Sequence, residues 1–226
     1  MGGARDAGGE GGELAGAGEA GLGGEGGEGG EGGAIPRLPP SCEGIDTCND
    51  ESPCITQLVP GGQFLMGRGD TGSDATIGDA NEQPEHSVRL SPFWLDKYEV
   101  SVGRFRRFVE SYDSGGRPAP GAGAHPQVSS SGWKKEFDSY LPATRADLEM
   151  KLITSDETGK EGCDASFRTW TPAAGNAECL PMNCLDWYTS FAFCIWDGGR
   201  LPSARETSSI ATSIPKIRRS CRTSST

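Results

Sequence analysis

The sequence predicts an α+β protein that is irregular and rich in loops. Three observations lead to this fold class. Short segments with strand character occupy the first half of the chain, helical patterns follow, and long segments rich in Gly, Ser and Pro separate these elements. Eight cysteines in 226 residues indicate that disulfides stabilise such a chain, and hence that it occupies an oxidising compartment.

The first 40 residues differ in composition from the rest of the chain. Residues 1–33 are almost entirely Gly, Glu and Ala, with seven acidic side chains against one basic, Arg5. They carry a net −6 of the chain's −11 and have almost nothing apolar to bury. Residues 34–40 are a Pro-containing continuation. We therefore expect residues 1–40 to be a disordered Gly/Glu-rich linker.

Residues 41–57 form a Cys-rich segment that is too short and polar to have a core of its own. Its three cysteines, six residues apart, favour one local disulfide and a third cysteine bonded elsewhere. Metal binding is the alternative, weakened because no histidine is near. A bond between Cys163 and Cys179 is a further pairing, although spacing alone leaves the connectivity open. The disulfide candidates are Cys42, Cys48, Cys54, Cys163, Cys179 and Cys184.

Two strand patterns follow the Cys-rich segment. A Pro-Gly-Gly turn leads into a short strand at Gln63–Met66, and residues 85–99 alternate apolar and polar positions until Pro92 interrupts them. We interpret His86 as the residue that begins this strand and not as a metal ligand. The loop between them, residues 68–84, is rich in Asp and Gly, but its spacing does not fit an EF-hand, which favours a solvated loop.

A helix is predicted after Ser101, whose hydroxyl can cap the first turn. Its apolar residues fall on one face at helical spacing: Val102, Phe105, Phe108, Val109 and Tyr112. The arginines at 104, 106 and 107 lie off this face, so we expect them in solvent. They make only a short basic run, which argues against a nucleic-acid partner. Further on, a short helix is predicted near residues 143–151 and a strand edge at residues 169–171.

Residues 180–202 contain a third predicted helix. Asp186 is placed at its positive end, and the following residues are apolar nearly all round, which predicts a helix buried in a core. Gly198 and Gly199 supply a left-handed stop. Ser203 and Glu206 then form the capping box of another helix.

Three blocks of sequence resemble a known family. They are VPGGQFLMG, EQPEHSVRLSPFWLDKYEVSVGRFRRFV and PMNCLDWYTSFAFCIWDGGRLPS, and their order and spacing are those of the formylglycine-generating enzyme, or sulfatase-modifying factor, family. The resemblance implies a C-type-lectin-like fold stapled by disulfides and calcium. It also implies copper-dependent oxidation of a cysteine in a sulfatase polypeptide to formylglycine, which makes that polypeptide the expected partner.

The sequence departs from the family after the third block. The family continues with an acidic helix and about as much chain again, which carries the copper-binding cysteines. Here we expect residues 58–206 to be a partial domain, its N-terminal half only, and residues 207–226 to be an aberrant, disordered tail such as a frameshift would produce. On this basis no catalytic residue, metal ligand or cofactor is expected in the chain. The resemblance also leaves Cys194 without its usual mate, so Cys194 and Cys221 are expected to be unpaired.

These observations leave several functions open. The first is a formylglycine-generating oxidase that is inactive in this form; the alternatives are a secreted lectin-like binding module without catalysis and a non-functional fragment. No phosphate loop or Ser-His-Asp set offers another chemistry. There is no 18-residue apolar run that would span a membrane and no signal after Met1. We expect export to the periplasm, cell surface or medium, with the signal preceding Met1.

Overall fold

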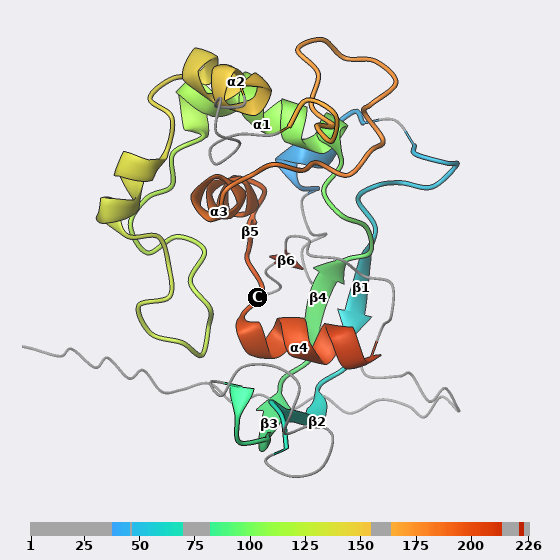
Figure 1. Ribbon diagram of the computed structural model, residues 1–226, viewed down its shortest axis with the longest axis vertical. Helices are drawn as coiled ribbons and strands as arrows, with labels where there is room; N and C mark the ends of the chain where they lie inside the picture. Colours follow the sequence, from blue (N-terminus) through green and yellow to red (C-terminus); the bar gives the residue numbers. More distant parts are fainter. Residues whose placement is uncertain (1–37, 46, 70–81, 155–163, 214–221, 224–226) are drawn as a thin grey trace, which may run out of the picture. The chain divides into compact units, whose positions relative to one another are not determined.

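The computed structural model describes residues 38–45, 47–69, 82–154, 164–213 and 222–223 (Figure 1). Residues 1–37 form a separate unit of the chain and lie outside this description, as do the Asp-rich part of the loop at 70–81, Cys163 and Cys221. The described part is a mixture of helices and small sheets, which confirms the α+β class. No helix in it is both long and apolar enough to cross a membrane.

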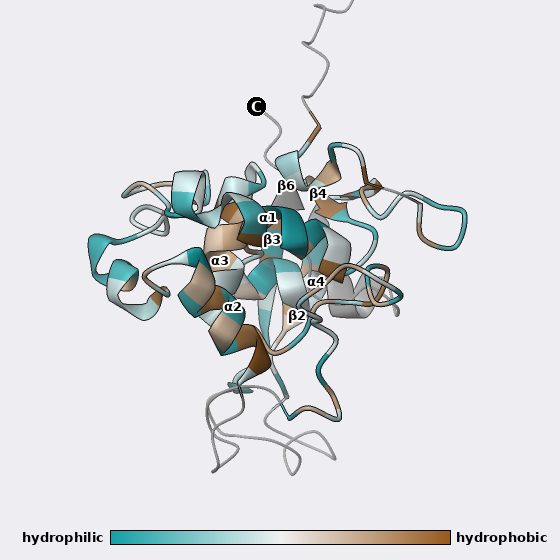
Figure 2. Ribbon diagram, turned by 90° about the horizontal axis from the view of Figure 1, so that it is seen from above, coloured by the Kyte–Doolittle hydropathy of each residue, from teal (hydrophilic) through white to brown (hydrophobic). Residues whose placement is uncertain are grey.

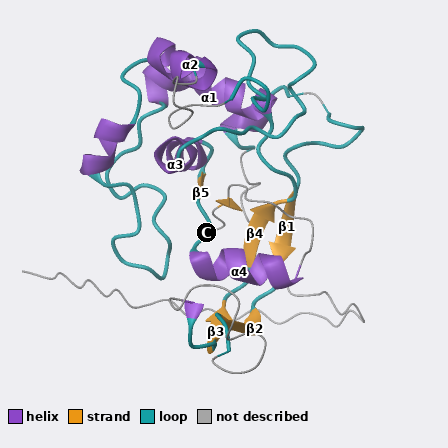
Figure 3. Ribbon diagram, viewed as in Figure 1, coloured by secondary structure: helices purple, strands orange, loops and turns teal. Residues whose placement is uncertain are grey.

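Helices and strands are short, and long loops join several of them (Figure 3). The strands are β1 (Thr56–Val59), β2 (Gly62–Met66), β3 (His86–Leu90), β4 (Phe93–Asp96), β5 (Gly199–Arg200) and β6 (Arg222–Thr223). The helices are α1 (Val102–Gly115), α2 (Arg145–Ile153), α3 (Trp187–Trp196) and α4 (Ala204–Ser213), with 3-10 turns η1 (Pro40–Cys42) and η4 (Lys135–Tyr140).

The strands form antiparallel pairs, β1 with β4, β2 with β3 and β5 with β6. The predicted break at Pro92 is confirmed, but the halves on its two sides belong to different sheets. The segment from β1 to β2 and the segment from β3 to β4 pass from one sheet to the other at the same place, beside Gly61. A Cβ on Gly61 would lie 2.7 Å from the carbonyl oxygen of Leu90 and 2.8 Å from the Pro92 ring, so only glycine permits the close crossing.

The main core lies between α1 and α3. Ser101 caps α1, since its Oγ accepts a hydrogen bond from the backbone N–H of Arg104, and the predicted apolar face of α1 is buried. α3 is apolar along most of its length (Figure 2). Phe193 on α3 lies with its ring centroid 5.4 Å from that of Phe105 and 5.7 Å from that of Phe108. Such aromatic pairs add roughly 0.5 to 1.5 kcal/mol each beyond the area that they bury.

Two of the three arginines on α1 are buried, which contradicts the expectation that all three face solvent. Arg104 is 1% exposed, and its guanidinium donates to Asp96 Oδ2 and Asp197 Oδ2, both at 2.7 Å, and to Ser41 Oγ at 2.9 Å. Ser41 in turn donates from its backbone N–H to Asp197. Helical periodicity could not reveal this, because the partners come from η1, β4 and the end of α3.

Arg106 is also largely buried, against the loop before α3. Its guanidinium forms hydrogen bonds with both carboxylate oxygens of Glu178, at 2.7 to 3.2 Å, and stacks over the ring of Trp170 at 4.4 Å. Trp170 was predicted to lie on a strand edge, but it lies in a loop. Only Arg107 is exposed as predicted.

Burial raises the pKa of Asp96 from 3.8 to about 6, although the neighbouring Arg104 opposes the shift. Between pH 3.8 and about 6, Asp96 is protonated in the folded protein but ionised in the unfolded chain. Its contribution to the free energy of unfolding is therefore complete at low pH and is lost as the pH rises toward 6. Relative to Asp96→Asn, the wild-type free energy of unfolding should therefore fall by up to about 3 kcal/mol between pH 3.5 and 7. Urea titrations at matched pH values measure this, and a difference that rises with pH would contradict it.

The disulfides confirm one prediction and correct two. Cys42 is bonded to Cys54, and Cys48 is bonded elsewhere, to Cys179, which excludes a Cys163–Cys179 bond. Cys184 and Cys194 are disulfide-bonded as well, and none of the described cysteines is free. The prediction that Cys194 is unpaired was therefore wrong, because it depended on family precedent and not on contacts within this chain.

The beginning of the expected disordered tail is ordered. Residues 207–213 continue α4, and residues 222–223 form β6. The predicted capping box at the start of α4 is present, because Ser203 and Glu206 exchange backbone-to-side-chain hydrogen bonds. Glu206 also accepts from Arg200 in a buried pair at 2.6 to 2.9 Å. These polar anchors lie at residues 200–206, and the low apolar content of the tail did not indicate that the helix continues past them.

Candidate functional site

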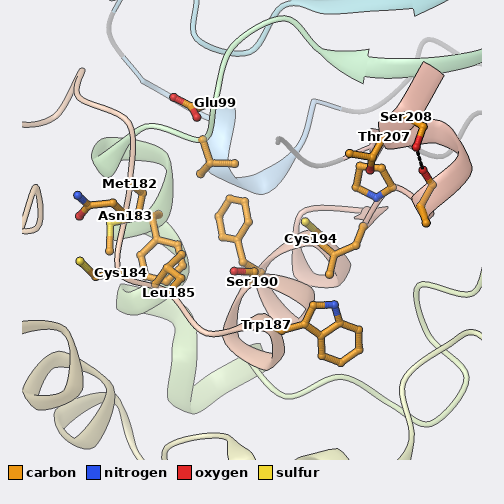
Figure 4. Close-up of a pocket in the computed structure, with 16 residues that line it drawn as sticks. Glu99, Met182, Asn183, Cys184, Leu185, Trp187, Ser190, Cys194, Thr207 and Ser208 are labelled. Carbon is orange, nitrogen blue, oxygen red and sulfur yellow. Dashed lines mark hydrogen bonds between the residues drawn. The ribbon is translucent and has the colours of Figure 1, made fainter. Parts of the chain in front are cut away.

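A cavity of about 650 Å³ lies beside α3 (Figure 4). Its walls come from the link between β4 and α1, the loop that precedes α3, α3 itself and the start of α4. Much of the lining is apolar: Phe105, Met182, Leu185, Phe193 and Leu201. A volume of this size lies within the range of small-molecule and side-chain binding pockets.

The loop before α3 is held in place by backbone hydrogen bonds to the other wall. The N–H of Met182 donates to the carbonyl of Val100 at 2.8 Å, and the N–H of Val102 donates to the carbonyl of Leu180 at 2.9 Å. These bonds place residues 180–182 beside the link between β4 and α1, as a short bridge between Ser101 and Pro181. The cavity wall is therefore built from two segments about 80 residues apart in the sequence.

Asn183 and Cys184 complete that loop. The side chain of Asn183 accepts from the N–H of Thr169 at 3.1 Å and donates to the carbonyl of Phe167 at 2.7 Å, which fixes the loop to its neighbour. Cys184 has a φ of +59°, a left-handed conformation that is uncommon for residues other than glycine, and it is disulfide-bonded. The loop is thus held in one backbone conformation by its side chains.

The N-terminus of α3 brings polar groups close to the cavity. Asp186 caps the helix by accepting from the N–H of Thr189 at 2.8 Å, and Lys151 of α2 donates to the same carboxylate. Burial acts to raise the pKa of Asp186, but the hydrogen bonds from Lys151 and Thr189 outweigh it and lower the pKa. Next to it, Trp187 lines the cavity and is 53% exposed.

The α4 side chains that line the cavity are uncharged. The hydroxyls of Thr207 and Ser208, which line it, donate to carbonyls one turn back in their own helix. Behind α4, the Nε2 of His125 lies 3.5 Å from Glu206 Oε1. Burial and the nearby Arg200 lower the pKa of His125, although Glu206 acts in the opposite direction. The lowered pKa favours the neutral ring at pH 7.

Glu99 is the carboxylate of this site, and it lines two cavities. It is half-buried and has no ion-pair partner among the described residues. The second cavity, about 360 Å³, is also lined by Glu51, Tyr98 and the Cys48–Cys179 disulfide. The larger cavity therefore combines apolar walls with one acidic group, which suits a polypeptide segment better than a phosphate or another anion.

Copper does not fit the described cysteines. Copper(I) is bound by thiolate or thioether sulfur, whereas these cysteines are all in disulfides. In the part of the chain that the structure describes, no group of three or more His, Cys, Asp or Glu side chains could hold a metal ion. Neither catalytic nor metal-binding residues were predicted from the sequence, and the cavity itself was not anticipated.

Comparison with known proteins identifies the family. Residues 47–213 match the model of the sulfatase-modifying factor enzyme 1-like domain. The chain belongs to this family. Among its relatives are an inactive C-alpha-formylglycine-generating enzyme 2 from Mus musculus, 28% identical over 172 residues, and a formylglycine-generating enzyme from Thermomonospora curvata, 28% identical over 155 residues. These alignments cover 74% and 66% of this chain and 49% and 45% of the relatives, so the chain spans about half of their length.

The cavity lies where two of the family-like sequence blocks meet. The second and third blocks that resemble sulfatase-modifying factors, residues 82–109 and 181–203, supply most of its lining. The sequence contained the signal for the site in these two blocks. What it lacked was their contact in space, which depends on the bridge between Ser101 and Pro181.

Proposed function

We propose that this chain binds a cysteine-containing segment of a sulfatase polypeptide in the cavity beside α3, as part of formylglycine generation. One observation carries the proposal: the two family blocks meet at a cavity of about 650 Å³ whose walls are mainly apolar and carry one carboxylate. An extended peptide can place a side chain in such a cavity while its backbone follows the rim.

Binding of the sulfatase segment and oxidation of its cysteine are separate steps, and we assign only the first to this chain. Relatives from Thermomonospora curvata, Bos taurus and Mus musculus are named formylglycine-generating enzyme, whereas other relatives from Mus musculus and Bos taurus have names that say they are inactive. In this chain the described cysteines provide no thiolate for copper. We therefore assign the described residues around the cavity to substrate binding and propose that they do not oxidise the cysteine by themselves.

The disulfides support a location in an oxidising compartment. Cys42–Cys54 and Cys48–Cys179 would be reduced in a cytosol that is buffered by glutathione. Export, to a place where sulfatases are also exported, is accordingly part of the proposal. A C-type-lectin-like fold is the corresponding proposal for the architecture, on the basis of the family.

A second candidate function is glycan binding by a lectin-like module without catalysis. The observation that favours it is a group of exposed aromatic rings. Tyr140, 55% exposed, stacks on Tyr188 with ring centroids 4.2 Å apart, and Trp187 meets Tyr188 edge to face. Flat exposed rings of this kind can pack against the apolar face of a sugar. Binding to immobilised glycans that is lost in Tyr140→Ala would favour this function.

Titration with a synthetic sulfatase-derived peptide that contains the modified cysteine tests the first proposal. We expect the peptide to change the tryptophan emission of the chain, because Trp187 lies on the cavity wall, and we expect Trp187→Phe to lose most of that change. Mass spectrometry of the recovered peptide then measures oxidation. Binding without formylglycine is the expected outcome; formylglycine made by this chain with copper would contradict the separation of the two steps, and no binding would contradict the proposal itself.

A further inference from the structure

The Cys48–Cys179 disulfide lies in the wall of the smaller cavity, about 360 Å³ in volume. Cys48 begins a tight turn in which its N–H donates to the carbonyl of Glu51 at 2.8 Å, and both central residues, Asn49 and Asp50, have positive φ angles of 52° and 64°. Cys48 is half-buried, while Cys179 is exposed. An incoming thiol can therefore reach one sulfur of this bond from solvent through the cavity.

Neither cysteine of the other local disulfide is exposed, although Cys54 is half-buried. Cys42 is 8% exposed, and the adjacent Ser41 is completely buried and bonded to Arg104 and Asp197. Thiol exchange requires attack along an open approach to a sulfur atom, and exposed disulfides are the labile ones. Cys179 is the exposed cysteine of these two bonds, so exchange should begin there faster than at Cys42–Cys54.

The charge around the cavity is negative. Glu51 is paired with Lys97, which leaves Glu99 as the carboxylate without an ion-pair partner among the described residues. Tyr98, Ser101 and Asn49 contribute only neutral polar groups. A partly buried carboxylate attracts cations and repels anions more strongly than one in water, because the local dielectric constant is lower.

We propose that Cys48–Cys179 is a thiol-exchange site for small cationic thiols. The thiolate attacks Sγ of Cys179 and forms a new disulfide with it. The old sulfur–sulfur bond breaks, its electron pair passes to Cys48, and the resulting Cys48 thiolate takes up a proton from water. The exchange needs no external oxidant or reductant. Glu99 lines both this cavity and the larger one that we assign to the sulfatase peptide, whereas Cys48 and Cys179 line only the smaller one.

The test compares two thiols of opposite charge on the whole oxidised chain, cysteamine and 2-mercaptoethanesulfonate, at low ionic strength and equal thiolate concentration. Acid quenching, intact-mass measurement and peptide mapping follow the first adduct. We expect the first adduct at Cys179. We expect cysteamine to react roughly three- to ten-fold faster than 2-mercaptoethanesulfonate, after correction for the intrinsic nucleophilicity of each thiol, measured on a model disulfide. Salt should reduce this preference.

Two glutamate variants test the role of charge. Glu99→Gln should abolish the preference for the cationic thiol, whereas Glu85→Gln, an exposed residue that lines neither cavity, should retain it. A first adduct at Cys42, Cys54 or the exposed Cys184 would overturn the proposal. So would equal rates for the two thiols in the wild-type chain.

Discussion

Replacing Cys48 and Cys179 together by serine should lower the free energy of unfolding by about 5 kcal/mol. The bond joins residues 131 positions apart, so its loss releases a long loop in the unfolded chain. In the chain-entropy model a loop of this length is worth about 5 kcal/mol, before any effect of the other cross-links. Urea denaturation under non-reducing conditions measures the difference.

The matched control is the Cys42→Ser, Cys54→Ser double variant. Its bond joins residues only 12 positions apart, and the same model assigns it about 3 kcal/mol. The long-range bond should therefore be the more stabilising of the two. If its removal left the unfolding midpoint unchanged, the Cys-rich segment would have to be held by other contacts, foremost the hydrogen bonds of Ser41.

Arg104→Leu should destabilise the protein by roughly 3 to 5 kcal/mol, because it leaves two buried carboxylates without their cation. Asp96 and Asp197 are 1% and 4% exposed, and both accept from this guanidinium at 2.7 Å. Chemical denaturation at pH 7 measures the effect. At pH 4.5 it should be smaller, since Asp96, with a folded pKa of about 6, is then protonated.

Arg107→Leu provides the comparison within the same helix. Arg107 is exposed, and its nearest carboxylate, on Glu110, is 4.0 Å away, so its replacement should change stability by no more than about 0.5 kcal/mol. Equal effects for the two arginines would show that the buried network does not contribute as described.

Local patterns in the sequence predicted much of the secondary structure. Ser101 as the cap of α1, Asp186 at the start of α3, Gly198 at its end and the capping box of α4 all depend on residues within one turn of one another. Each is a short-range preference of the backbone. For the same reason the helix near residues 143–151 was predicted, and it is present as α2 with Thr144 as its cap.

The errors occurred where contacts are distant in the sequence. Arg104 looked solvated because its partners lie up to 93 residues away, and Cys194 looked unpaired because pairing was inferred from family precedent. The strand β1 was overlooked because it pairs with β4, more than 30 residues later. The cavity depends on the same kind of contact, between the link before α1 and the loop before α3.

Binding of the cysteine-containing sulfatase peptide to a variant with a filled cavity tests the central claim most directly. Ser190 lines the cavity and donates its hydroxyl to its own helix, so Ser190→Trp would occupy the space, while Ser114→Trp changes an exposed serine that also bonds to its own helix. With both variants shown to be folded by circular dichroism and cooperative melting, calorimetry should show peptide affinity reduced at least ten-fold for Ser190→Trp and unchanged for Ser114→Trp. Undiminished affinity in the folded Ser190→Trp protein would contradict the assignment of the cavity beside α3 as the substrate-binding site.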